Sequence, residues 1–425
     1  MAVIYRQEIL QDITLFTSQP KAKFYSDLFL HLDLSKFPEF NANTGRKGFS
    51  NQAKLRAAIV MKCECFSCVT DLLDYLQNNL LIAHYCGFNI MKPLPSYWTL
   101  DRFINSLDND LLQNLMHSKV KKLYELGVID TSFIALDSTL VMANTSQNNP
   151  KSFKKDKFNP DNQPKSDKDC ALGVHTASNQ HNEKKCEFYW GYKNHVLVDC
   201  ITGLPIFELT TTADVSDSTV ALDILSQTNS FLPVNECTFI ADKAYDVKAI
   251  YNTVKDIYEG DCVIPLNKRN TKNPKKFSSG HPICEAGLAM NKDGKCRSEG
   301  RIRQKYCCPF RNSKSGCCPC NHKNWNNGKK HRGCTKYITV PDDYRLSIDH
   351  ECISFKKIYA LRTEAERYNA RFKQTGQERL WVHSENAAKN LNTIAHIALL
   401  AVAYAAFITN SNHSVRCLKS AKRIA

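Results

Sequence analysis

Two short apolar stretches of this sequence each run directly into an aspartate. In FIALDST, residues 133–136 precede Asp137, and in FIADKAYD, residues 239–241 precede Asp242. Short apolar runs of this composition are typical of buried strands. An isolated buried carboxylate is costly unless it is paired or bound to a metal ion. Either both aspartates cap loops or helices, or the fold brings two carboxylates to one site.

The segments around these stretches predict a mixed sheet. Residues 190–200 and 204–213 are expected to form a hairpin that turns at Thr202-Gly203, and 260–267 to form a further strand. A helix is expected over 248–258. Strands in a hairpin, followed by strand, helix and strand, favour an α/β sheet with helices on its faces. Before residue 129 the apolar spacing at 52–79 and 93–127 predicts a helical domain, either a structural cap or a DNA-reading domain.

A helix expected over 353–376 carries an unusual set of polar residues. At 100° per residue, Tyr359, Arg362, Glu366 and Lys373 fall within an arc of about 60°. Two cations, a phenol and a carboxylate therefore share one face. The alternative is an ordinary salt bridge within the helix between Arg362 and Glu366.

The positive charge of the chain is concentrated in one stretch. Residues 265–336 hold 18 Lys plus Arg and 3 Asp plus Glu, which accounts for the formal net charge of +15 of all 425 residues. Such a stretch is either a solvated surface or a module that binds a polyanion, most often nucleic acid. The runs 268–276 and 327–332 would supply phosphate contacts, with Lys268, Arg269, Lys329 and Lys330 as candidates.

The same stretch is rich in cysteine. Eight of the 19 cysteines lie between residues 284 and 334. The N-terminal residues show no secretory signal, so reduced thiols are expected rather than a disulfide framework. The pairs CCPF and CCPC suggest a structural zinc site, for which Cys307, Cys308, Cys317 and Cys320 are candidates, although unligated thiols remain the alternative and the pairing stays open. The apolar stretch 391–410 is expected to be a buried core helix rather than a membrane span.

These motifs together resemble the DDE transposases of bacterial insertion sequences. Tyr359, Arg362, Glu366 and Lys373 reproduce the spacing Y-x2-R-x3-E-x6-K, which looks like the signature around the third acidic residue in one large branch of that family. ALDST resembles the strand of the first aspartate, and FIADKAYD resembles the motif of the second. WGYKNHVLVDCITGLP resembles the strand pair between them, with its GYK-H motif. Ala244 stands where relatives commonly have glycine, and the Cys-rich insertion has no clear counterpart in the resemblance.

The resemblance implies an RNase H-like mixed sheet with flanking helices, a helical N-terminal domain and a basic Cys-rich insertion domain. The implied boundaries are 1–128 for the N-terminal domain, 129–267 and 346–425 for the catalytic core, and 268–345 for the insertion. The implied catalytic residues are Asp137, Asp242 and Glu366, holding two Mg²⁺ (or Mn²⁺) ions for cleavage and joining of DNA. Arg362 and Lys373 would contact the DNA backbone, with Tyr359 packed beside them.

The family also implies the partners and the setting. The implied partner is double-stranded DNA, both the terminal inverted repeats and the target DNA, with a homodimer assembled on it and no membrane. The implied location is the bacterial cytoplasm, in association with the nucleoid. Two alternatives remain. One is a non-catalytic, zinc-containing DNA-binding protein derived from a transposase, and the other is a metal-dependent nuclease with no joining step.

Overall fold

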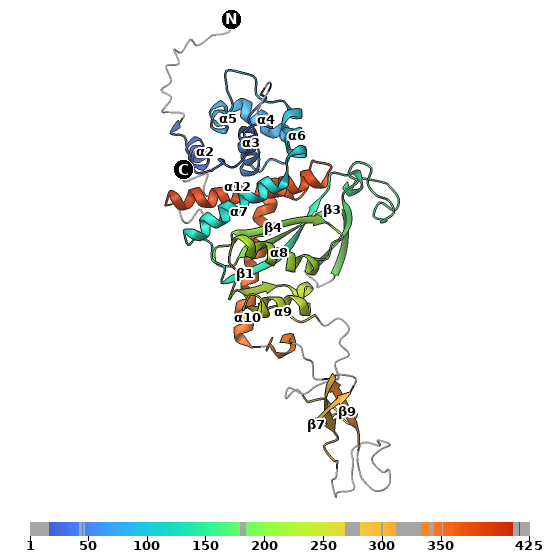
Figure 1. The fold of residues 1–425 in the computed structure, drawn as a ribbon. Coiled ribbons are helices and arrows are strands. Elements are labelled where there is room, and N and C mark those ends of the chain that lie inside the picture. The colour runs from blue at the N-terminus through green and yellow to red at the C-terminus, as the bar shows by residue number, and fades with distance from the viewer. Residues whose placement is uncertain are drawn as a thin grey trace. The chain divides into compact units, whose positions relative to one another are not determined.

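The chain folds into two compact units. Residues Met1–Pro265 and Glu351–Ala425 form the first, and Leu266–His350 the second. The computed structural model describes residues 17–41, 45, 47–178, 184–267, 281–298, 301–311, 333–339, 344–350, 352–410 and 416. Figure 1 shows the elements in chain order, coloured from blue to red.

A six-stranded mixed sheet lies at the centre of the first unit. Its strands are β1 (Phe133–Met142), β2 (Ala171–Ser178), β3 (Lys184–Asp199), β4 (Pro205–Thr212), β5 (Thr238–Ala241) and β6 (Asp261–Val263). The order is β2-β3-β1-β5-β6, and β4 also pairs with β3. Strand β3 is antiparallel to β1, β2 and β4, whereas β1, β5 and β6 run parallel. The expected mixed α/β sheet is therefore confirmed, and the expected hairpin turns at Gly203, whose φ is 68°.

Helices of the N-terminal part precede the sheet. They are α2 (Pro20–Leu30), α3 (Asn51–Cys63), α4 (Val69–Asn78), α5 (Leu80–Cys86), α6 (Tyr97–Ser106) and α7 (Asn109–Glu125). Side-chain caps begin two of them, since Ser50 accepts from the backbone of Ala53 and Asp108 from that of Asp110. Gly127, with φ of 70°, follows the end of α7. These helices belong to the same compact unit as the sheet.

The remaining helices of this unit are α8 (Asp217–Phe231), α9 (Lys248–Asp256), α10 (Ile353–Tyr359), α11 (Thr363–Phe372) and α12 (Glu385–Ile408). The single helix expected over 353–376 is divided. A 3₁₀ turn, η4 (Ala360–Arg362), separates α10 from α11, and a π turn, η5 (Lys373–Gln377), follows α11. Short 3₁₀ turns also lie at η1 (Ser146–Asn148), η2 (Lys243–Tyr245) and η3 (Tyr344–Ser347). Helix α8 and strand β2 were not expected from the sequence.

Helix α12 is the core helix of the first unit. It packs against α3, α6, α7 and β4, and Figure 1 shows α7 lying alongside it. It is the one helix in the described part of the chain that is long and apolar enough to cross a membrane, with a mean hydropathy of 1.9. In that stretch 83% is buried inside the protein, as expected of a core helix.

A buried polar network joins α7 and α12 to the sheet. The Glu208 carboxylate on β4 accepts hydrogen bonds from Asn194 Nδ2 (2.7 Å), Gln113 Nε2 (2.5 Å) and Thr393 Oγ1 (2.5 Å). Burial raises the pKa of Glu208, and these donors oppose that rise. From Asn194 the network continues to His396 on α12 (3.0 Å) and on to Tyr368 on α11 (2.5 Å). Helix α11 is thereby tied to the centre of the sheet.

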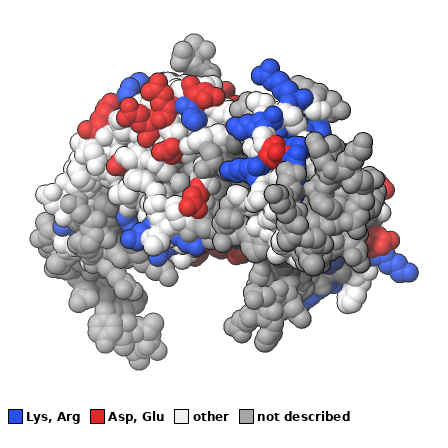
Figure 2. All heavy atoms as spheres, turned by 90° about the horizontal axis from the view of Figure 1, so that it is seen from below, with Lys and Arg blue, Asp and Glu red and all other residues white. Residues whose placement is uncertain are grey.

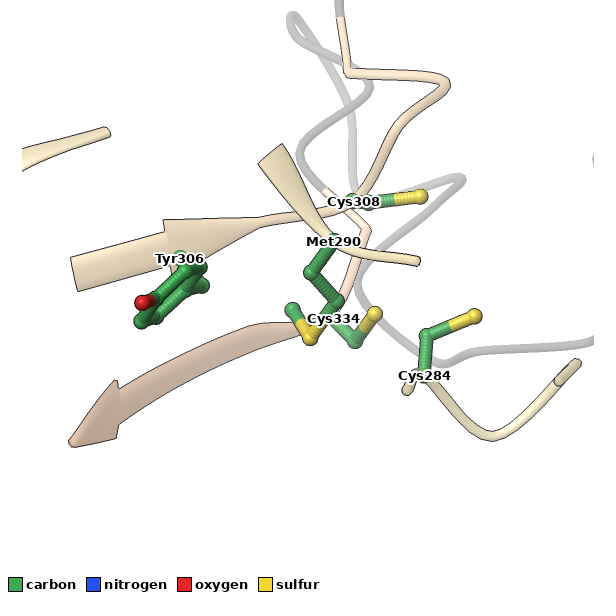
Figure 3. Packing of buried hydrophobic residues seen from close by; sticks show 5 residues of the cluster. All are labelled: Cys284, Met290, Tyr306, Cys308 and Cys334. Carbon is green, nitrogen blue, oxygen red and sulfur yellow. The ribbon is translucent and has the colours of Figure 1, made fainter. Parts of the chain in front are cut away.

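The second unit contains a three-stranded antiparallel sheet. Its order is β7 (Asn291–Ser298), β8 (Arg301–Cys307) and β9 (Thr335–Thr339). Its small core consists of five buried side chains that Figure 3 shows together: Cys284, Met290, Tyr306, Cys308 and Cys334. The three cysteines are free thiols.

Candidate active site

Two neighbouring parallel strands bring the two aspartates together. The prediction that both end a strand is wrong for Asp137, since β1 continues to Met142, and holds for Asp242. Strands β1 and β5 pair in register, with Leu136 opposite Ala241. Asp137 and Asp242 are the next residues on each strand, and adjacent strands lie about 5 Å apart. The structure therefore places Asp137 and Asp242 side by side, and Asp242 is close enough to raise the pKa of Asp137.

Asp242 also has a local structural role. Its Oδ1 accepts a hydrogen bond of 2.7 Å from the backbone N–H of Ala244, which begins the 3₁₀ turn η2. Asp242 therefore caps a turn, which was the alternative to a shared carboxylate site for the two aspartates. The cap occupies one of the two carboxylate oxygens, and it shows that the turn accommodates Ala244 without a positive φ.

Helix α11 carries Glu366 toward this edge of the sheet. The helix packs against β1 and β3 through its buried face, which includes Ala365, Tyr368 and Phe372. Arg371 anchors it further, because its guanidinium donates a 2.5 Å hydrogen bond to the carbonyl oxygen of Gly203 in the β3–β4 turn. The Glu366 side chain itself is about half exposed, at 52%.

Arg362 lies between two of the carboxylates. Its guanidinium is 3.8 Å from Asp137 Oδ1 and forms an ion pair with Glu366, one helical turn away. The ring of Tyr359 lies beneath it, 5.9 Å from the guanidinium carbon. The intrahelical salt bridge therefore exists, but it also reaches the strand that carries Asp137. Arg362 therefore links this helical segment to Asp137 on β1.

Asn369 is a site residue that the sequence did not indicate. It lies three residues after Glu366, hence on the same side of α11. Its Nδ2 donates a 3.0 Å hydrogen bond to Asp137 Oδ2. Its Oδ1 is buried and accepts no hydrogen bond from the described residues. The only sequence signal that could have pointed to Asn369 is this spacing from Glu366.

The surroundings of Asp137 offset the negative charge of its carboxylate only in part. Burial raises its pKa to about 6, the nearby Arg362 guanidinium opposes the rise, and Asp242 and Glu366 add to it. Acidic groups brought together in this way favour binding of a cation.

The donor chemistry of the site suits a hard divalent cation. Asp137 and Asp242 supply carboxylate oxygens, and the unsatisfied Oδ1 of Asn369 supplies an amide oxygen, which are the donor types that Mg²⁺ prefers. Among the described residues, however, no three acidic, imidazole or thiol side chains are placed as a ready metal-binding group. Arg362 gives a physical reason, since it pairs with Glu366 and holds that carboxylate.

The residues expected to contact DNA fall into two groups. Tyr359 and Arg362 lie at the acidic site, and Lys373 lies half-buried at the end of α11. Lys268, Arg269, Lys329 and Lys330 lie outside the described residues. Figure 2 shows one face on which described acidic and basic side chains are both exposed, so that face is not uniformly basic.

The candidate zinc ligands are not placed as one set. Cys317 and Cys320 lie outside the described residues. Cys308 joins the core cluster with Cys284 and Cys334 (Figure 3). Tyr306 belongs to the same cluster. Because side chains alternate along a strand, we expect Cys307 on the other face of β8, where its side chain is hydrogen-bonded to Arg311. The zinc ligands stay a prediction.

The GYK-H motif on β3 is structural. A Cβ atom on Gly191 would lie 2.2 Å from the carbonyl oxygen of Val141, so β1 and β3 require glycine there. Lys193 forms an ion pair of 3.2 Å with Asp217, the first residue of α8. His195 lies 3.8 Å from the same carboxylate. The motif fixes β1 and α8 against β3.

Residues 129–401 match the sequence model of a family described as Transposase DDE domain. The chain belongs to this DDE transposase family. The matched range includes Asp137, Asp242 and Glu366. A search among curated proteins finds no match to this DDE transposase.

Solved transposase structures show distant likenesses to this DDE transposase. The piggyBac transposase synaptic complex with hairpin DNA has 11% identity and a TM-score of 0.41, covering 97% of this chain and 78% of that one. The Mos1 transposase paired-end complex with the left transposon end has 11% identity and a TM-score of 0.17, covering 52% of this chain and 61% of that one. Both TM-scores lie below 0.5, so membership of the family rests on the sequence match.

Proposed function

We propose that this chain is a DNA transposase that cleaves DNA at the ends of its element and joins those ends to target DNA. The observation that supports it best is the register of β1 and β5, which sets Asp137 beside Asp242. Glu366 would be the third acidic residue, since α11 packs on β1 and Arg362 and Asn369 of this helical segment contact Asp137.

The finer classification is part of the same proposal. The spacing of Tyr359, Arg362, Glu366 and Lys373 favours the Y-x2-R-x3-E-x6-K branch of bacterial insertion sequences. The sheet, with antiparallel β4, β3 and β1 followed by parallel β5 and β6, supports an RNase H-like core. The N-terminal helices would bind DNA, and the second unit would be the basic insertion. The protein would act as a homodimer on DNA, in the cytoplasm near the nucleoid.

The acidic residues would hold divalent cations, Mg²⁺ or Mn²⁺. When bound, such ions activate water or a 3′-hydroxyl as the nucleophile and stabilise the leaving oxygen of the phosphodiester. The chain's own residues have distinct tasks. Asn369 fixes the orientation of Asp137 through its Nδ2–H. The cap on Ala244 fixes Asp242. Arg362, released from Glu366, would donate hydrogen bonds to a phosphate oxygen of the DNA backbone, with Tyr359 supporting its guanidinium.

The proposed function is tested with a supercoiled plasmid that carries the coding sequence with its native flanking DNA. In Mg²⁺ or Mn²⁺ the wild-type chain should cut at the flanks and join the ends to a second DNA. Asp137→Ala, Asp242→Ala and Glu366→Ala should each reduce both steps to background while DNA binding persists. Glu364→Gln is the matched control, because Glu364 lies on the same helix but pairs with Arg367 and Arg416. Cutting that survives Asp137→Ala would contradict the proposal.

The alternative is a non-catalytic DNA-binding protein with zinc in its second unit. It requires none of the three carboxylates, so the wild type would bind DNA without metal-dependent cleavage. Cleavage without joining would instead indicate a nuclease of the same fold.

A further inference from the structure

A lysine-lined pocket lies in the segment that connects β1 to β2. Its volume is about 520 Å³, and it opens between η1 and residues 154–166. Four lysines line it, Lys154, Lys155, Lys157 and Lys165, together with polar side chains that include Gln147. No part of the acidic site described above contributes to it. A cavity of this size lies within the range of protein sites that bind ligands.

The backbone around this pocket is held in place by specific hydrogen bonds. Gln147 Nε2 donates to the carbonyl oxygen of Asn162 at 2.6 Å, which closes the segment on itself. Trp190 Nε1 on β3 donates to the carbonyl oxygen of Lys157 at 2.8 Å. Asn148 exchanges two hydrogen bonds with the backbone of Trp190, at 2.7 and 2.9 Å. The lysines therefore stand on a framework attached to the sheet.

Two acidic side chains at the end of this segment bind to the scaffold. Asp167 is buried and accepts from the hydroxyl of Tyr192 at 2.9 Å. Asp169 accepts from the backbone N–H of Glu385 at the start of α12, at 3.0 Å. The residues that line the pocket include no carboxylate. The lining thus carries four positive charges and no negative one, an arrangement that favours an anionic ligand.

The position of the pocket relates it to the acidic site through β1. Strand β1 runs on from Asp137 to Met142, a rise of about 17 Å, and three further residues lead to η1 at the pocket.

We propose that this pocket binds the sugar–phosphate backbone of the DNA whose phosphodiester lies at the acidic site. The inference rests on the proposed function. Lysine ammonium groups act as point charges toward phosphate and displace counterions from DNA, so the contribution is independent of base sequence.

Two double variants test the assignment. Lys155→Ala/Lys165→Ala removes two pocket lysines, and Lys151→Ala/Lys168→Ala removes two from the same segment outside the pocket lining. All four are exposed, so neither pair should change the thermal stability. Binding of a duplex that contains the element end is measured between 50 and 200 mM salt, in the Asp137→Ala background so that no DNA is cut.

The pocket variant should lower the slope of log Kobs against log salt by about 1.8, or 0.9 per phosphate contact, and the control variant should leave it unchanged. Equal effects of the two pairs, or no effect of the pocket pair, overturn the inference. If the pocket pair binds like its Asp137→Ala parent while the wild-type chain cleaves DNA, this inference alone fails. A wild-type chain that binds no DNA defeats the proposed function as well.

Discussion

Asn369 shows how a single amide can organise an acidic site. Asp137 is surrounded by other acids and shielded from water, and its pKa is raised to about 6 by burial. The side-chain N–H of Asn369 donates a hydrogen bond to one carboxylate oxygen of Asp137. The Oδ1 of Asn369 belongs to the same amide and accepts no hydrogen bond from the described residues. Groups that orient a metal ligand commonly change metal affinity by 10- to 100-fold.

We therefore expect Asn369→Ala to weaken Mn²⁺ binding by about tenfold. Mn²⁺ affinity is measured directly by electron paramagnetic resonance, and the Mn²⁺ concentration for half-maximal cleavage should rise in parallel. Asn390→Ala is a matched control, since Asn390 is fully buried and its amide donates to the carbonyls of Ile104 and Leu107 and accepts from Asn109, all away from the acidic site. It should reduce stability without changing Mn²⁺ affinity. An unchanged affinity in Asn369→Ala would exclude this role.

His396 makes stability depend on pH. Its Nδ1 accepts from the Tyr368 hydroxyl and its Nε2–H donates to Asn194, so the neutral ring is satisfied. Burial lowers its pKa to about 3, against about 6.5 in an unfolded chain. Between these values the unfolded state binds the extra proton, so stability is lost as the pH falls, by up to about 1.4 kcal/mol per pH unit.

Urea unfolding at pH 7, 6, 5 and 4 measures this slope. His396→Gln should flatten it even if the variant is less stable overall. His383→Gln, at an exposed histidine, should retain the wild-type slope. A wild-type slope in His396→Gln would assign the acid sensitivity to other groups.

At the scale of elements, Gly191 of the GYK-H motif on β3 determines how closely β1 approaches β3. Gly191→Ala should destabilise the chain by about 3 kcal/mol or more, because its Cβ would meet the Val141 carbonyl oxygen, a backbone atom that cannot move alone. Gly48→Ala is the control, since no atom lies within 4 Å of its added Cβ. Thermal denaturation compares the two. Similar melting temperatures would mean that the strands can separate locally.

The elements that the sequence predicted are those with strong local patterns. The stretches that lead into Asp137 and Asp242 are short apolar runs, and both form strands, although β1 continues beyond Asp137 to Met142. Helix α8 was missed because its Ser, Thr and Asn residues have modest helix propensity. Strand β2 was missed because ALGVHTAS has few β-branched or aromatic residues and no strict apolar alternation, even though it pairs with the next strand in the sequence.

The part of the candidate site that depends on a local sequence pattern was also predictable. The face shared by Arg362 and Glu366 follows from helical spacing, and the two remain paired even though η4 interrupts the helix. The contacts of Arg362 and Asn369 with Asp137 could not be predicted, because they depend on how α11 packs on β1. Tertiary packing of this kind leaves no periodic signal in a single sequence.

At the scale of the whole molecule, each unit has its own core. The first is built around α12 and the sheet, and the second around the cluster with Met290. We expect two transitions in calorimetry, since units with separate cores can unfold separately. Met290→Ala should lower only the transition of the second unit, and Ile394→Ala on α12 only that of the first. A single transition shifted by both variants would show that the units unfold cooperatively.

The bridge that Arg362 makes between Asp137 and Glu366 has a thermodynamic consequence. If the proposed function holds, a phosphodiester that attracts the guanidinium would release both carboxylates, and a metal ion that attracts the carboxylates would release the guanidinium. DNA and metal would then bind with positive cooperativity, and linkage requires each to raise the affinity of the other by the same factor. A chain without DNA would hold its metal weakly, and so would remain a poor hydrolase until it is loaded on its substrate.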